Sequence, residues 1–490
     1  MDYFNFIFYK KAKFFVWQVI FILILANFTL KTIFPTILVS LSMFTIFVFI
    51  YKYFVSAKNL IGLVFIVYIG SYFQYGIAQG GLFTLASFLF LFLLYLKLPS
   101  INPFYNKLFF IRILINIIII SNFIGYLFKN ESSLIDLILG AISFMGLIMI
   151  FNTISALQFS KLLYGNFVKI SFFVMLYSLL ISLNKLFMIY NSPLPIFGTS
   201  TRWGSQNLGG TLGPSPIAGE LGLLFLGIVL PLFFAKGNFL KDYNISRFIV
   251  PLFLIVSLLT LILAASRSTI ILAAATIILI SIISLIKKRK FKSQIKVSYI
   301  FTLLLIGLIT ISISSYMNMD YVLSRFENVE VDKITIESLT TGEGINRTTA
   351  FEVGEDMIKR EHWFIGYGWG VGESNRIAWF GDSSFFRSDP HSLYLSLFPI
   401  WGWIGSIAYL LILLFITTHL FLISLRTNDY PTYLIGFGLF VANFFFLINE
   451  YKITSMGYPH YFMITWILHG FCISFIVDNK KQKRGLNNEN

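Results

Sequence analysis

Residues 389–405, DPHSLYLSLFPIWGWIG, mark the point at which a long polar segment gives way to an apolar one. The polar segment begins near Tyr316, and from there to Gly405 the chain carries 13 of its 22 acidic residues. Apolar runs flank it on both sides. A connector of this length is far longer than two membrane spans need, and long loops are commonly functional. We therefore expect the chemistry of the protein to lie in this segment.

The composition indicates a membrane protein. Hydrophobic residues make up 57% of the chain and charged residues 12%, which is more apolar surface than a soluble domain can bury. The net charge of +15 would suggest a nucleic-acid partner in a soluble protein. Here the positive residues lie in short connectors between apolar runs, so no nucleic acid is expected. The single Cys472 excludes an intramolecular disulfide, and the first apolar run is too long for a cleavable signal.

Runs of roughly 20 apolar residues predict an all-α polytopic fold with about fourteen transmembrane helices. The predicted spans are 14–30, 33–51, 59–78, 81–98, 108–128, 134–157, 167–189, 216–235, 247–265, 268–286, 298–316, 392–423, 432–449 and 459–477. Lys10, Lys11 and Lys13 indicate that the N-terminus lies inside. Strict alternation then puts the basic cluster Lys287–Lys290 and the C-terminus on the cytoplasmic side as well.

The spans divide the chain into five parts. These are N-terminal spans (1–190), central spans (191–315), a large extracytoplasmic loop (316–391), C-terminal spans (392–478) and a cytoplasmic tail (479–490). The central part has an outer loop at 191–215, which contains Arg202, and an outer turn at 264–269, which contains Arg267. The topology therefore places these two arginines and the large loop on the same side of the membrane.

Taken one at a time, the polar residues on this side have ordinary interpretations. Arg267 would snorkel at the interface, although an arginine at membrane depth costs about 2.5–3.5 kcal/mol and is a candidate for binding an anion. Arg347 would be a solvated loop residue and His391 an interfacial cap. Gly366–Gly370 fits a tight turn with its aromatic residues against the membrane surface, but lacks the strand and helix of a phosphate-binding loop.

Together these residues resemble the O-antigen ligase and O-antigen polymerase superfamily. That family has a histidine at the end of the large outer loop, a leucine-rich start of a span, and then Gly-x-x-Gly. His391, Leu393, Leu395, Gly402 and Gly405 stand at these intervals here.

Three other segments extend the resemblance to roughly residues 200–425. They are Arg347 followed by Trp363–Gly368, Ser266-Arg267 between two spans, and Gly210–Pro216. Two positions depart from the family pattern, because Ser392 replaces a common asparagine and Trp363 a common proline. Residues 1–190 are similar only in being a series of spans.

The resemblance implies a bacterial cytoplasmic-membrane enzyme that moves a glycan from a polyprenyl diphosphate carrier to an acceptor hydroxyl on the outer face. Arg267 and Arg347 would hold the developing phosphate charge through their planar forks, without a metal or other cofactor. Arg202 would be a further binding residue. His391 would be the general base, with Asp389 orienting it or capping the loop.

Other classes of protein fit the sequence less well. A metal-dependent glycosyltransferase would show paired carboxylates in its first outer loop, where this chain has only a few residues around Lys31. A flippase or transporter would have ionisable residues within its spans, and such residues, for example Arg112, Asp136 and Lys185, are sparse here. A structural membrane subunit would not explain the family spacing.

Within the family, chain length and span number favour a polymerase, which extends a lipid-linked glycan. The alternative is a ligase, which moves the glycan to a lipid core. The partners implied are the polyprenyl diphosphate-linked oligosaccharide donor, a glycan or lipid-core acceptor, and polysaccharide-assembly proteins. The sugar, the linkage and the oligomeric state stay open.

Overall fold

A computed structural model of the chain describes residues 109–128, 134–156, parts of 161–179, 215–235, 237–264, 267–290, 364–369, 392–451 and 459–488. In these residues the regular elements are helices, and there is no strand. The helices are α5 (Phe109–Phe128), α6 (Leu134–Ala156), α8 (Ser215–Phe233), α9 (Gly237–Asp242), α10 (Ile249–Ala264), α11 (Arg267–Lys290), α17 (Leu393–Arg426), α18 (Tyr430–Asn449) and α19 (Pro459–Asn488). The all-α prediction is therefore confirmed for this part of the chain.

Several of these helices are suited to cross a bilayer. Among the described residues, α5, α17 and α18 are long and apolar enough to do so. Shorter apolar helical stretches are Ala218–Phe233, Ile249–Ala264, Ser268–Ile283 and Ile464–Asn479. Large apolar side chains such as Ile120 and Leu414 stay exposed on the helix surfaces, as expected where lipid covers them. The chain is thus a membrane protein.

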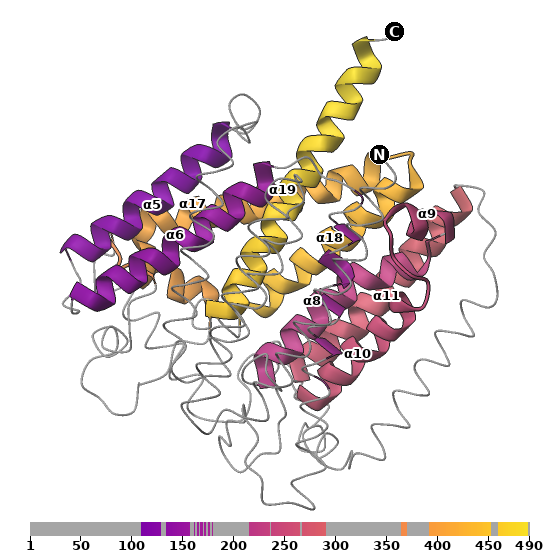
Figure 1. The fold of residues 1–490 in the computed structure, drawn as a ribbon, viewed down its shortest axis with the longest axis horizontal. Helices are drawn as coiled ribbons and strands as arrows, with labels where there is room; N and C mark the ends of the chain where they lie inside the picture. The colour runs from indigo at the N-terminus through magenta and orange to yellow at the C-terminus, as the bar shows by residue number, and fades with distance from the viewer. Residues whose placement is uncertain are drawn as a thin grey trace, which may run out of the picture.

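The described residues cover only some of the predicted spans. The predicted spans at 14–30, 33–51, 59–78, 81–98 and 298–316 lie outside the described residues. The count of about fourteen, which follows from apolar run length, therefore stays a prediction. The last helix, α19, continues past the predicted span end at 477 and projects beyond the other helices (Figure 1). Lysine, glutamine and arginine are good helix formers, which favours a helical Lys480–Arg484.

The helices form two groups that α17 and α18 connect. In the first group, α8 packs against α10, α11 and α18. In the second, α5 packs along α17, and α6 packs along α19, which also contacts α17 (Figure 1). Because α17 also packs on α18, the C-terminal helices bridge spans that are far apart in the sequence.

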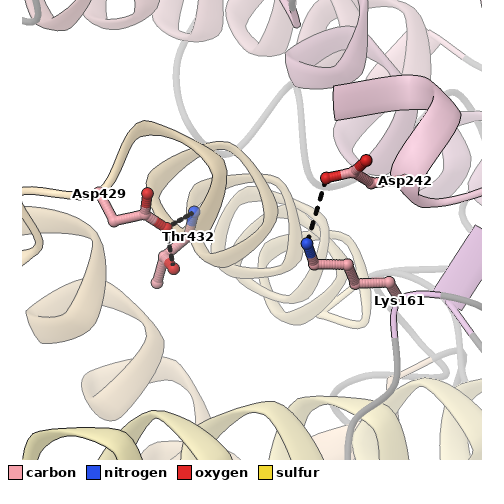
Figure 2. A network of polar contacts seen from close by, with 4 residues as sticks. All are labelled: Lys161, Asp242, Asp429 and Thr432. Atoms are coloured by element: carbon pink, nitrogen blue, oxygen red, sulfur yellow. Dashed lines mark hydrogen bonds and ion pairs between the residues drawn. The ribbon is translucent and has the colours of Figure 1, made fainter. Parts of the chain in front are cut away.

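One end of the bundle, here called the inner end, holds connectors that the charge pattern predicts to be cytoplasmic. Lys161 forms an ion pair with Asp242, with 3.2 Å between Nζ and Oδ2 (Figure 2). Nearby, the carboxylate of Asp429 caps α18 by accepting from the backbone N–H of Thr432 at 2.9 Å (Figure 2). The ion pair brings the connector before α10 to the same end as Lys161.

Two tyrosines support this grouping of connectors. The hydroxyl of Tyr430 donates to the carbonyl of Phe234 at 3.2 Å, which joins the start of α18 to the end of α8. Tyr243 follows α9, and burial raises the pKa of its phenol above the ordinary value. The negative charges of Asp429 and Asp242 raise the pKa further, so all three groups lie close together.

Deep in the bundle, a polar bridge joins α17, α18 and α19. The amide nitrogen of Asn443 donates to Oγ1 of Thr417 at 2.6 Å, and the Thr417 hydroxyl donates to the carbonyl of Leu413 at 2.8 Å. The amide oxygen of Asn443 lies 3.1 Å from Nε2 of His469. That nitrogen therefore carries the proton, and the bridge fixes the histidine tautomer. Interhelical hydrogen bonds of this kind hold apolar spans in register.

Candidate functional site

The opposite end of the bundle, here called the outer end, contains the start of α17 and the end of α18. Ser392 precedes α17 with an extended backbone, and its side chain makes no capping hydrogen bond. Instead, the backbone N–H of Leu393 donates to the carbonyl of Glu450 at 2.8 Å. Ser392 and Leu393 are both fully buried. The chain is therefore fixed at the residue that directly follows His391 in the sequence.

The turn between α10 and α11 lies at the same end. Arg267 is the first residue of α11, and Ala264 is the last residue of α10. A Cβ added to Gly219 of α8 would lie 3.0 Å from Oγ1 of Thr269 and 3.1 Å from Cβ of Ala264. The absence of a side chain at Gly219 thus lets α8 lie directly against both sides of this turn.

A buried hydrogen bond connects these two features. The side-chain amide of Asn449, the last residue of α18, donates to Oε1 of Glu220 in α8. Glu220 follows Gly219, and Glu450 follows Asn449. Glu220, Asn449 and Glu450 are all buried. The start of α11 and the start of α17 are therefore linked through α8 and α18 at the outer end.

The glycine-rich part of the large loop packs against a break in α17. Gly402 has a φ of +65°, which interrupts the helix, and the residues before a helix interruption have carbonyls that need other partners. The backbone N–H groups of Tyr367 and Gly368 donate to the carbonyls of Pro399 and Ile400 at 2.7 and 2.8 Å. The loop segment Phe364–Trp369 thus replaces helical hydrogen bonds with its own.

This contact requires a glycine on each side. A Cβ added to Gly366 would lie 2.3 Å from the carbonyl carbon of Ile400, and one added to Gly402 would lie 2.4 Å from the carbonyl oxygen of Phe364. Both distances are far shorter than van der Waals contact. The loop backbone and the α17 backbone therefore touch directly.

Asn122 of α5 holds the other side of the segment. Its Oδ1 accepts from the backbone N–H of Trp369 at 2.7 Å and from Nε1 of Trp401 at 3.0 Å. The hydroxyl of Tyr126 donates to the carbonyl of Trp369. The expectation that the aromatic residues of this segment lie on the membrane surface is wrong for Trp369, which is 4% exposed. The hydrogen bonds from α5 draw it inside, whereas Phe364 remains exposed.

The predicted site residues are only partly reached by the structure. Arg202, Arg347, Asp389 and His391 lie outside the described residues. Arg267 begins α11, but its side chain is also outside them. The structure describes the helix starts next to Arg267 and His391. The roles of all five residues therefore stay predictions.

Two polar residues of this framework received no role from the sequence. Asn122 and Glu220 each lie in a mainly apolar span, and a polar group within a membrane is costly unless it has a partner. A polar residue within an apolar run is therefore the sequence signal that would have identified Asn122 and Glu220. Within the residues that the structure describes, no group of three or more His, Cys, Asp or Glu side chains is placed to hold a metal.

Comparison with known families finds a match for the central part of the chain. Residues 252–410 match the model of a family described as O-Antigen ligase. The matched region runs from α10 into α17 and includes Arg267, Arg347 and His391. No curated protein sequence matches the chain. The match confirms the resemblance to the O-antigen ligase/polymerase superfamily over residues 252–410 of this membrane protein.

Proposed function

We propose that the protein is a polysaccharide polymerase that transfers a glycan from a polyprenyl diphosphate carrier to the hydroxyl of an acceptor glycan at the outer face of the cytoplasmic membrane. The family match over residues 252–410 carries this proposal. The framework at the outer end supports it, because the helix starts next to Arg267 and His391 are joined through α8 and α18.

The chemistry requires two kinds of group. The acceptor oxygen attacks the anomeric carbon of the donor sugar, the bond from that carbon to the diphosphate breaks, and the acceptor proton leaves. His391 takes the proton as general base. Arg267 and Arg347 stabilise the negative charge that develops on the leaving diphosphate, with Arg202 as a further contact.

Two helix starts at this end offer local positive potential to an anionic substrate. Both α11 and α17 begin at the outer end, so the positive ends of their macrodipoles lie there, beside the negative ends of α10 and α18. Arginine charges together with helix termini would neutralise a diphosphate without a divalent metal. Transfer by the purified protein should therefore continue in excess chelator, and a loss restored only by magnesium or manganese would contradict this part of the proposal.

A ligase is the second candidate, and the description of the matched family favours it. The two activities differ in their acceptor. Purified protein supplied only with polyprenyl diphosphate-linked oligosaccharide should build a ladder of longer lipid-linked chains if it is a polymerase. A product that forms only after a lipid core is added would identify a ligase.

The orientation of the protein is part of the proposal. In a background without Cys472, a cysteine at position 340 should react with a membrane-impermeant reagent in intact cells, and one at position 290 should not. The opposite labelling pattern would put the large loop in the cytoplasm, where it could not meet an outer-face acceptor.

A further inference from the structure

Glu220 is a buried acid at the outer end of α8 to which the proposed reaction gives no task. Its exposed fraction is 3%, and it is the sixth residue of the helix, so it lies about 7.5 Å along the axis from Ser215. An acid within a membrane helix is costly, and it usually faces the interior of the protein with a partner. Such a residue is a candidate for function, and its partners indicate which one.

On one side, Glu220 leads to the start of α17. Its Oε1 accepts from the side-chain amide of Asn449, which is 2% exposed. The next residue, Glu450, accepts from the backbone N–H of Leu393 at 2.8 Å. Two consecutive residues of α18 thus connect the Glu220 carboxylate with the residue two positions after His391.

On the other side, Glu220 adjoins the turn that contains Arg267. A Cβ added to Gly219 would lie 3.0 Å from Oγ1 of Thr269 and 3.1 Å from Cβ of Ala264, so α8 packs closely on this turn. Arg267 opens α11 two residues before Thr269, so the carboxylate-bearing turn of α8 lies against the first turn of α11. A buried carboxylate in an apolar environment is stable only when hydrogen-bonded or paired with a cation.

We propose that Glu220 is a positioning residue for Arg267. Its carboxylate, held by Asn449, fixes the first turn of α11 against the start of α17 and balances the charge of the arginine, so that the guanidinium is oriented for the diphosphate. Glu220 itself contacts no substrate. This inference rests on the proposed function, in which Arg267 binds the donor.

A double-mutant cycle on donor binding tests the inference. Glu220→Gln keeps an oxygen that can accept from Asn449 but removes the charge. We expect the KM for the lipid-linked donor to rise about tenfold, within the range of coupling between neighbouring residues, with a smaller change in kcat. Arg267→Lys should raise the donor KM at least as much. The donor KM of the double variant should be no higher than that of Arg267→Lys alone, because both changes weaken the same contact with the diphosphate.

Asn443→Leu is the matched control, because Asn443 lies in α18, as the Glu220 partner Asn449 does, and makes a buried bridge to His469 and Thr417. Its effect on the donor KM should be small and should multiply with that of Arg267→Lys. Glu220→Asp keeps the charge on a shorter side chain and should fall between wild type and Glu220→Gln.

The outcomes separate two kinds of failure. If Arg267→Lys leaves the donor KM unchanged, the proposed function itself is wrong about this arginine. A second outcome is that Arg267→Lys raises the donor KM, and that the double variant shows the product of the two single fold-changes, as the control does. Glu220 is then only a structural support, and the inference is overturned. Should Glu220→Gln fail to reach the membrane, the same cycle with Glu220→Asp decides by the same rule.

Discussion

The two ends of the helix bundle are held together in different ways. At the inner end, Lys161 and Asp242 form an ion pair whose side chains are 59% and 57% exposed. At the outer end, the connecting side chains of Glu220, Asn449 and Asn122 are at most 3% exposed. Exposed ion pairs contribute about 0–1 kcal/mol, whereas a buried polar group that loses its partner costs about 1–3 kcal/mol. Of these contacts, those at the outer end are therefore the more costly to break.

This difference fits a division of roles between the two faces of the membrane. A transfer reaction requires its groups in near-attack geometry, and such geometry needs a rigid frame around them. The loop segment Phe364–Trp369 is fixed on one side by the break in α17 and on the other by α5. At the inner end, nothing in the proposed reaction requires comparable precision. Changes at the two ends should therefore have unequal effects.

The largest effect is expected at the predicted base. His391→Ala removes the group that accepts the acceptor proton, a task usually worth about 10²–10⁴-fold in rate. Turnover should fall by that factor in a transfer assay with purified protein and lipid-linked donor, while donor binding changes little because the histidine acts on the acceptor. Normal polysaccharide from His391→Ala protein, present in the membrane at wild-type level, would show that the residue is not catalytic.

The next largest effect is expected where the loop touches α17. In Gly366→Ala, the added methyl group would meet the carbonyl of Ile400 at 2.3 Å, and backbone cannot move aside as a side chain can. A displacement of about 1 Å in a catalytic framework can cost about 10²-fold in rate, so transfer should fall by that order.

Gly436→Ala in α18 is the control for this change. There the added Cβ would meet the edge of the Phe475 ring at 3.1 Å, close to the inner end. A ring can shift slightly, so activity should stay within about twofold of wild type. Equal losses in the two variants would remove the distinction between the ends.

A smaller effect is expected from Asn122→Ala. The change leaves two buried N–H groups, those of Trp369 and Trp401, without their acceptor, at about 1–3 kcal/mol each. The large loop should then dissociate from α5 more often, and protease added to the outer face should cleave the loop faster. An unchanged cleavage rate would mean that the α17 contacts alone hold the segment.

The sequence predicted the helices better than the contacts between them. The spans near 108–128, 432–449 and 247–265 coincide with α5, α18 and α10, because bilayer thickness sets the length of an apolar run. The pairing of helices follows no such rule, since leucine packs on lipid as well as on leucine.

The candidate site shows the same limit. Family spacing pointed to Arg267 and His391, and the structure joins the helix starts beside them. The break at Gly402 was hidden within an apolar run, because the interruption depends on hydrogen bonds from a loop more than thirty residues earlier. Asn122 lies 247 positions from its partner Trp369, a separation that no local pattern reveals.

The smallest effect is expected at the inner end. Lys161→Met removes the ion pair with Asp242, whose two side chains are more than half exposed. Solvent already screens this pair, so the free energy of unfolding should change by no more than about 1 kcal/mol. Transfer activity should stay at the wild-type level, and thermal unfolding of the detergent-purified protein at low and high salt should give nearly the same midpoint for variant and wild type. A loss of transfer comparable to that of Gly366→Ala would mean that the inner connectors also set the geometry of the site, and the contrast between the two ends would no longer hold.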